Sequence, residues 1–136
     1  PAFDPQKQEI FIGLHKKSGL WLANGGHIDK GELLQETLER EMLEEWGIVI
    51  ASSKSRVADL LTLTKIVSNP AGRPCRYHYD IWFFIEVNKA KFKPDFNKLA
   101  EEFFEVKWLT PGEAKKIVID PSTLIAIKFL EKQIFS

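Results

Sequence analysis

Apolar, β-prone side chains gather in the first part of the chain. Residues 9–15 are rich in β-prone side chains and precede a Ser-Gly pair, so we expect a strand that turns back into residues 20–22. Residues 57–67 and 77–87 are rich in β-branched and aromatic side chains and predict two long strands. The segment between them contains Pro, Gly and Asn, which are typical of a loop.

Helical spacing appears in residues 33–46, and Gly47 follows at a position where a left-handed residue commonly ends a helix. Residues 105–109 predict a short strand, and Pro111 opens a short helix. The sequence Asp-Pro-Ser then begins a final helix that runs to about residue 133. With 44% hydrophobic residues the chain can bury a core, so these elements predict an α/β fold in a single domain over residues 1–136.

The overall charge and composition limit the classes of partner. Nineteen basic and nineteen acidic residues cancel, so the chain lacks the positive excess that drives sequence-independent binding to nucleic acid or anionic membranes. No apolar segment approaches the roughly 20 residues of a membrane span, and no signal-peptide pattern is present. The single cysteine, Cys75, excludes an internal disulfide and fits a passive thiol in a reducing compartment, so we expect a cytoplasmic protein.

The predicted helix of residues 33–46 places carboxylates beside its apolar face. At 100° per residue, Glu41 and Glu45 fall within or beside the apolar stripe, and Glu44 lies just off its edge. Burying unpaired carboxylates costs on the order of several kcal/mol, and a divalent cation that prefers oxygen ligands, such as Mg²⁺ or Mn²⁺, would compensate. The alternative is a solvated helix face with Lys or Arg partners. The apolar stripe consists of Leu34, Leu38, Met42 and Trp46.

The residues before this helix complete a motif with fixed spacing. Gly25 and Gly26 allow close approach of the backbone, and Gly31 permits a tight turn into the helix. The motif reads Gly26, five residues, Glu32, seven residues, Arg40-Glu41-Met42, one residue, Glu44-Glu45, one residue, Gly47-Ile48. It resembles the Nudix box at every fixed position, and the order of elements resembles a Nudix domain over nearly the whole chain. The resemblance implies the Nudix fold, a mixed β-sheet between helices, and hydrolysis of a nucleoside diphosphate linked to another group.

The resemblance also implies roles for individual residues. Glu32 and Arg40 would form a pair that fixes the loop on the helix. The ligands of divalent metal, Mg²⁺ or Mn²⁺, would be the carboxylates of Glu41, Glu44 and Glu45 and the carbonyl oxygen of Gly25. A bound water would lose a proton and attack the diphosphate in line, so no nucleophilic side chain and no organic cofactor are required.

A general base in this family often comes from a loop glutamate shortly before a Trp-containing strand. Glu101, Glu102 and Glu105 precede Trp108, and we prefer Glu102. The alternative is that Glu102 is a surface residue and a glutamate of the box is the base. One departure from the family pattern is Asn24, which stands where relatives often have proline. The lack of this proline affects the stiffness of the strand end more than the metal chemistry.

The group attached to the diphosphate is read by residues outside the box. Residues 61–65 lack the proline typical of ADP-ribose hydrolases and the tyrosine typical of diadenosine-polyphosphate hydrolases, so we favour a nucleoside triphosphate or related nucleotide. Aromatic side chains can stack on a nucleobase and an arginine can meet a phosphate. On this basis the predicted substrate contacts are Trp21, Arg76, His78 and Trp82. The alternative is that the aromatic side chains belong to the core and that His78 is a structural histidine.

Two other functions share the fold. Some Nudix domains are sensors that bind a nucleotide or sugar nucleotide without cleaving it, but such domains usually have degraded boxes and this box is intact. Isoprenoid diphosphate isomerases need a cysteine, and Cys75 lies in a predicted loop where that role is not assigned. We expect a small-molecule nucleotide partner and a monomer or homodimer, with no membrane and no strong nucleic-acid binding.

Overall fold

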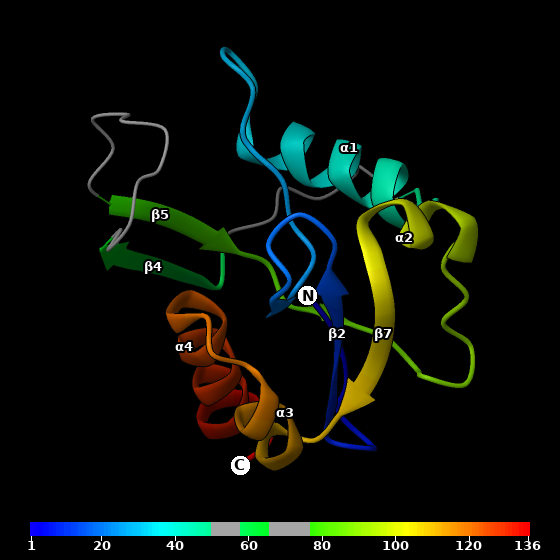
Figure 1. Cartoon of the computed structure of the whole chain (residues 1–136), viewed down its shortest axis with the longest axis vertical. Helices are drawn as coiled ribbons and strands as arrows, with labels where there is room; N and C mark the ends of the chain where they lie inside the picture. The colour runs from blue at the N-terminus through cyan, green and yellow to red at the C-terminus, as the bar shows by residue number, and fades with distance from the viewer. Residues whose placement is uncertain (50–57, 66–76) are drawn as a thin grey trace.

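The central strand of the protein is β2 (Glu9–His15), which is paired along both edges. The computed structural model describes residues 1–49, 58–65 and 77–136. One edge of β2 pairs antiparallel with β7 (Phe103–Leu109). The other edge pairs with β1 (Ala2–Asp4) near its start and with β3 (Trp21–Leu22) near its end. Because β6 (Ile85–Glu86) adds to β1 in parallel, the five-stranded sheet is mixed (Figure 1).

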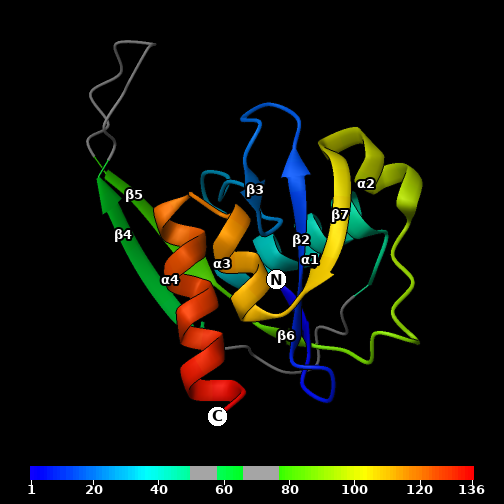
Figure 2. The same cartoon turned by 60° about the horizontal axis from the view of Figure 1, so that its bottom comes forward.

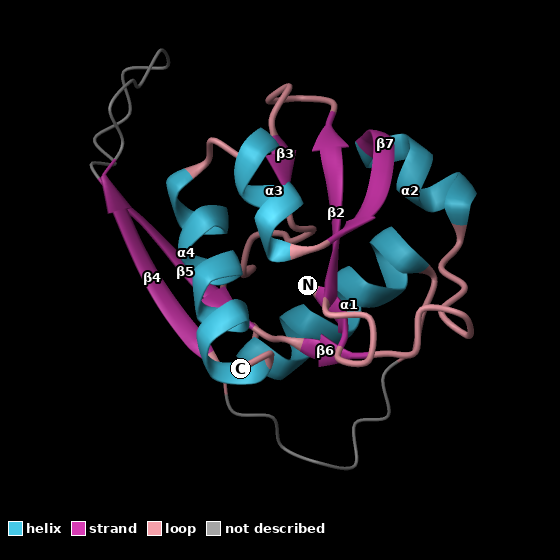
Figure 3. Cartoon of the chain, turned by 90° about the horizontal axis from the view of Figure 1, so that it is seen from below, coloured by secondary structure: helices cyan, strands magenta, loops and turns pink. Residues whose placement is uncertain are grey.

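A second, two-stranded sheet consists of β4 (Leu60–Lys65) and β5 (Tyr77–Trp82), and it lies beside helix α4 (Pro121–Phe129) (Figure 3). Buried polar groups join this sheet to the helix. The Trp82 indole donates to Thr62 Oγ1 at 2.9 Å, and Thr62 Oγ1 lies 2.7 Å from Ser122 Oγ. Ser122 Oγ is also 2.7 Å from Asp80 Oδ2, to which it donates. These bonds satisfy groups that would otherwise be costly to bury, and they fix the two-stranded sheet on α4.

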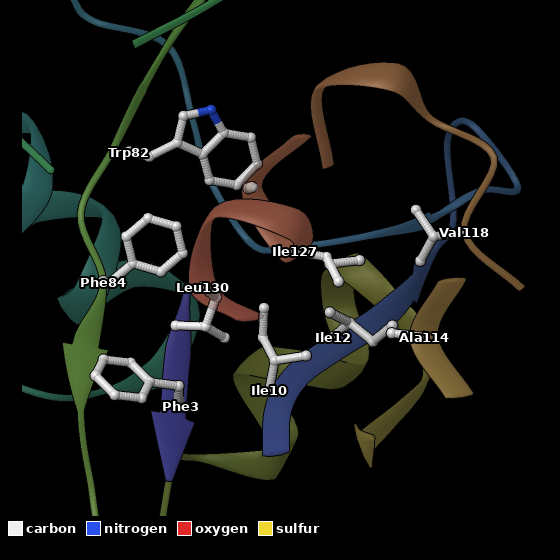
Figure 4. Packing of buried hydrophobic residues seen from close by; sticks show 10 residues of the cluster. Phe3, Ile10, Ile12, Trp82, Phe84, Ala114, Val118, Ile127 and Leu130 are labelled. Atoms are coloured by element: carbon white, nitrogen blue, oxygen red, sulfur yellow. The ribbon is translucent and has the colours of Figure 1, made fainter. Parts of the chain in front are cut away.

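Helices cover both faces of the five-stranded sheet (Figure 2). Side chains of β2 alternate between the faces, as a strand requires. Ile10 and Ile12 pack with Ile127 and Leu130 on the side of α3 (Pro111–Ile117) and α4 (Figure 4). On the opposite face Phe11 meets Trp46 edge-on, with ring centroids 6.0 Å apart, in the cluster that includes α1 (Leu34–Trp46) and α2 (Phe96–Glu102). A mixed sheet between helices confirms the expected fold class.

Elements with strong local signals were predicted correctly. The strand of residues 9–15 is β2, and the helix expected at residues 33–46 is α1, which begins one residue later. Gly47 has a φ of 66° and ends α1 in the left-handed conformation, as expected. The final helix begins at Pro121 and continues beyond α4 as a π-helical segment, η1 (Leu130–Ile134). Within the described parts of the chain, no helix is long and apolar enough to cross a membrane.

Elements that depend on pairing differ from the prediction. The long strand expected at residues 77–87 is broken, because β5 pairs with β4 whereas β6 pairs with β1 in the other sheet. Of the strand expected at residues 57–67, residues 58 and 59 lie outside β4, which begins at Leu60, and β7 begins before residue 105. Neither β1 nor α2 was predicted, although Asp95 caps α2 by accepting bonds from the backbone N–H groups of Asn97 and Lys98. The expected loop between β4 and β5, with Cys75, lies outside the described residues.

Candidate active site

The loop between β3 and α1 lies against the acidic side of α1 at Gly26. A Cβ atom added at Gly26 would lie 1.9 Å from Glu41 Oε1, whereas one added at Gly25 would meet nothing within 4 Å. Gly31 has a φ of +87°, which other residues rarely adopt. The close approach predicted for the Gly-Gly pair is therefore present at Gly26, and the tight turn predicted at Gly31 is confirmed.

Glu32 and Arg40 form the ion pair that the family resemblance implies. Arg40 Nε donates to Glu32 Oε1 at 2.8 Å, and Nη2 donates to Glu32 Oε2 at 3.0 Å. Nη2 also donates to the carbonyl oxygen of His27 at 2.9 Å. The pKa of Glu32 is lowered to about 2, mainly by the bond from Arg40 and then by bonds from the Asp29 N–H and the Thr37 hydroxyl. This pair therefore joins the loop to the middle of α1 in the geometry that a bidentate guanidinium favours.

Arg40 also contacts two of the predicted metal ligands. Its Nη1 donates to Glu41 Oε1 at 2.7 Å and to Glu44 Oε2 at 3.3 Å. The Glu41 side chain is 15% exposed, whereas that of Glu44 is 60% exposed. The alternative interpretation of the acidic helix requires Lys or Arg partners, and Arg40 is such a partner for Glu41 and Glu44. Among the described residues, this arginine contact does not extend to Glu45.

Glu45 is the carboxylate whose environment is least favourable to charge. Burial and then the charge of Glu41 raise the pKa of Glu45 to about 8, while a hydrogen bond from the Asn24 side chain opposes the shift. Glu45 Oε2 is buried, and no hydrogen-bond donor in the described part of the chain reaches it. Leaving a buried acceptor unpaired costs about 1–3 kcal/mol, so a cation or a donor at this atom would be stabilising.

The donor set fits a hard divalent cation in its chemistry, because it consists of carboxylate oxygens with one buried oxygen unpaired. Its geometry is less complete. Within residues 1–49, 58–65 and 77–136, no group of three His, Cys, Asp or Glu side chains is arranged so that it could hold a metal ion together. Since Glu44 is bonded to Arg40, its carboxylate would have to turn to join Glu41 and Glu45.

Glu102 lies within electrostatic range of this cluster. It ends α2, its side chain is 44% exposed, and its charge contributes to the raised pKa of Glu45. Glu102 Oε2 also lies 3.8 Å from His15 Nε2, while Glu101 is exposed and Glu105 forms an ion pair with Lys107 at 3.2 Å. The structure therefore brings Glu102 toward the box glutamates.

The predicted substrate contacts lie in different parts of the fold. Trp82 lies in the hydrophobic core and is 8% exposed (Figure 4). Its indole is bonded to Thr62. Trp21 is half-buried on β3, with Lys107 Nζ 5.1 Å from its ring centroid. His78 is exposed on β5 opposite Thr64, and Arg76 lies outside the described residues. The location of Trp82 shows a packing role.

Sequence reasoning missed Thr37, whose hydroxyl donates to Glu32 Oε2 at 2.8 Å. The only signal was a threonine in the first turns of an amphipathic helix. That signal is ambiguous, because threonine in a helix commonly bonds the carbonyl four residues earlier.

Comparison with known proteins agrees with the fold and the motif. A family model described as NUDIX domain matches residues 3–132, so the chain belongs to the Nudix family. An uncharacterized Nudix hydrolase from Nostoc sp. (strain PCC 7120) is 28% identical over 94 residues, which are 68% of this chain. The matched region is 47% of the length of that relative, so the chain spans about half of it.

Solved structures of hydrolases have the same fold. The dihydroneopterin triphosphate pyrophosphohydrolase of E. coli superposes with a TM-score of 0.73 at 18% identity, covering 98% of this chain and 90% of that chain. The Ap4A hydrolase of C. elegans in a binary complex has a TM-score of 0.63 at 16% identity, covering 96% and 91%. At these identities the superpositions establish the Nudix fold, and with the family match they confirm the resemblance seen in the motif.

Proposed function

We propose that this chain is a divalent-metal-dependent hydrolase that cleaves the diphosphate linkage of a nucleotide. The observation that carries the proposal is the buried Oε2 of Glu45, which no donor of the described residues reaches, within electrostatic range of the enclosed carboxylate of Glu41. This placement is not explained by stability alone, because burial and the charge of Glu41 make Glu45 costly to ionise. A site that binds a cation and an anionic substrate explains the arrangement, and the family match supports it.

In this proposal Glu41, Glu44, Glu45 and the carbonyl oxygen of Gly25 would hold Mg²⁺ or Mn²⁺. When bound, the ion would neutralise diphosphate oxygens and lower the pKa of a water molecule. Glu102 would accept a proton from the attacking water, whose oxygen forms a bond to one phosphorus while the bridging P–O bond breaks. With a nucleoside triphosphate the products would be the monophosphate and pyrophosphate. Glu32 and Arg40 would keep the loop in place throughout.

A nucleoside triphosphate or related nucleotide is the substrate class that we favour. Two proteins with this fold are named for compounds in which several phosphates are joined, a pterin triphosphate and Ap4A. Trp21 and His78 are the described candidates for contact with the base, and Arg76 remains a candidate for contact with a phosphate. The burial of Trp82 in the core disfavours a contact between its side chain and the substrate.

The test is a panel of nucleoside triphosphates, dinucleoside polyphosphates, ADP-ribose and sugar nucleotides, each incubated with Mg²⁺ and followed by product analysis. We expect products of diphosphate cleavage from at least one compound with the parent protein, and turnover at least about 100-fold lower with Glu45→Gln. Tight binding of a nucleotide without turnover would instead establish a sensor. The absence of both binding and turnover across the whole panel would overturn the proposed substrate class.

A further inference from the structure

The hydroxyl of Thr37 is buried beside the loop that precedes α1. Thr37 is 8% exposed, and its Oγ1 lies 2.8 Å from Glu32 Oε2 and 3.2 Å from the carbonyl oxygen of Leu33. A hydroxyl has a single proton to donate. The bond to the carboxylate is shorter and charge-assisted, so it takes that proton. Thr37 therefore bonds a residue of the loop in preference to its own helix.

Glu32 Oε2 is the point where loop and helix meet. It accepts bonds from the Asp29 N–H at 3.1 Å, from Thr37 Oγ1 at 2.8 Å and from Arg40 Nη2 at 3.0 Å. The other oxygen, Oε1, accepts from Arg40 Nε at 2.8 Å. Asp29 donates from the loop and Arg40 donates from the middle of α1. Thr37 donates from near the start of α1. We call these four residues, Asp29, Glu32, Thr37 and Arg40, the loop latch.

We propose that Thr37 is a positioning residue that holds Glu32 in the loop latch, and so keeps the loop carrying Gly25 and Gly26 against the acidic side of α1. The inference rests on the proposed function for its catalytic consequence, although the contacts themselves do not. Arg40 is the link, because the same guanidinium that bonds Glu32 also bonds Glu41. A Glu32 side chain that turns away would release the guanidinium and change the position of Glu41 beside Gly26.

The test compares Thr37→Val, which keeps the shape but removes the hydroxyl, with Thr37→Ser, which keeps the hydroxyl. Thr123→Val is a matched control, because Thr123 is 2% exposed and its hydroxyl donates to Asp120 Oδ2 at 2.7 Å in α4. The measurements are hydrogen exchange of the Asp29 amide, binding of Mn²⁺, and kcat and KM for any nucleotide that is cleaved. Thermal melting shows that each variant is folded.

Loss of a hydrogen bond to a charged group changes an equilibrium by about 10-fold or more, so Thr37→Val should speed exchange of the Asp29 amide by about that factor. Binding of Mn²⁺ should weaken and kcat should fall, by about 3- to 10-fold each because the other donors remain. Thr37→Ser should stay within about twofold of the parent in all three measurements. Thr123→Val should lower the melting temperature without changing the Asp29 amide or the binding of Mn²⁺.

A double-mutant cycle separates the latch from an ordinary bond within the helix. If Thr37 acts through Glu32, Thr37→Val should have no further effect on Mn²⁺ binding in a Glu32→Ala background, which removes the acceptor of the Thr37 hydroxyl. An equal effect in both backgrounds, or parent-like exchange at Asp29 in Thr37→Val, would overturn the inference. If the parent protein cleaves no nucleotide, the proposed function fails, whereas exchange and Mn²⁺ binding still decide the role of Thr37.

Discussion

Replacing Glu45 with Gln should stabilise the metal-free protein while removing its activity. Glutamine keeps the size of the side chain but carries no charge. In the folded chain the pKa of Glu45 is raised from 4.5 to about 8, first by burial and then by Glu41. At about 1.4 kcal/mol per pH unit, the ceiling on the cost of ionising Glu45 in the folded state is about 5 kcal/mol. A buried glutamine amide with incomplete hydrogen bonding costs about 1–3 kcal/mol, so above pH 8, where the full penalty is present, the net gain should be about 2–4 kcal/mol.

This gain has a defined dependence on pH. Below pH 4.5 the carboxyl group is protonated in the folded and unfolded chains alike, and its charge costs nothing. Between pH 4.5 and about 8 the unfolded chain releases the proton first, so the stability of the parent falls as the pH rises. Above pH 8 the full penalty is present. Glu45→Gln removes this titration, so the variant should be no more stable than the parent at pH 5, where the cost of the buried amide outweighs the small ionisation penalty, and more stable than the parent at pH 8.5.

Urea unfolding in EDTA at these two pH values measures the difference. Glu44→Gln is the matched control, because the Glu44 side chain is 60% exposed and its replacement should change stability by less than about 1 kcal/mol. With Mg²⁺ present, turnover of Glu45→Gln should fall by about 100-fold or more, equivalent to about 2.7 kcal/mol of barrier. A variant that is less stable than the parent at pH 8.5, or equally stabilised at both pH values, would refute the reasoning.

Three further predictions follow from the same contacts. Arg40→Ala should lower turnover strongly, because Arg40 bonds the loop. It should reduce the melting temperature less than Leu38→Ala does, because Leu38 packs against the core. Parent-like turnover of Arg40→Ala would count against a role of Arg40 in positioning the loop. Gly26→Ala should displace Glu41 and lower turnover by about 10-fold or more. Gly112→Ala on α3, where an added Cβ meets nothing within 4 Å, should leave turnover unchanged. A pH-stat or coupled assay compares the two variants, and equal activities would contradict the close approach at Gly26. Turnover should be highest on the alkaline side, because attack needs a deprotonated water, and a maximum near pH 5 in a pH–rate profile would contradict this.

Features set by short stretches of sequence were predictable. The helix of residues 33–46 has both its apolar spacing and its terminating Gly47, and each signal acts within one or two turns. The paired Glu32 and Arg40 were also predictable, because they belong to a motif with fixed spacing. The enclosure of Glu41 and Glu45 followed from their positions relative to the apolar stripe.

Features set by contacts between distant segments were not predictable. The polar contacts of Trp82 in the core depend on distant residues. Its indole bonds Thr62, which is 20 positions away, and Thr62 bonds Ser122, which is 60 positions from Thr62. The break between β5 and β6 exists because their partner strands belong to different sheets. The bond from Arg40 to Glu44 could not be chosen in advance, because a carboxylate at this spacing can bind a metal, a cation of the protein or water.

The central claim is that the box glutamates act with a divalent cation to cleave a nucleotide. The most direct measurement takes the best nucleotide of the panel, removes metal from protein and buffer with a chelator, and follows turnover as free Mg²⁺ is restored. We expect no measurable turnover after metal removal and a saturable return with Mg²⁺ that Glu45→Gln lacks. Undiminished turnover in the metal-free protein, or full recovery in Glu45→Gln, would contradict the account.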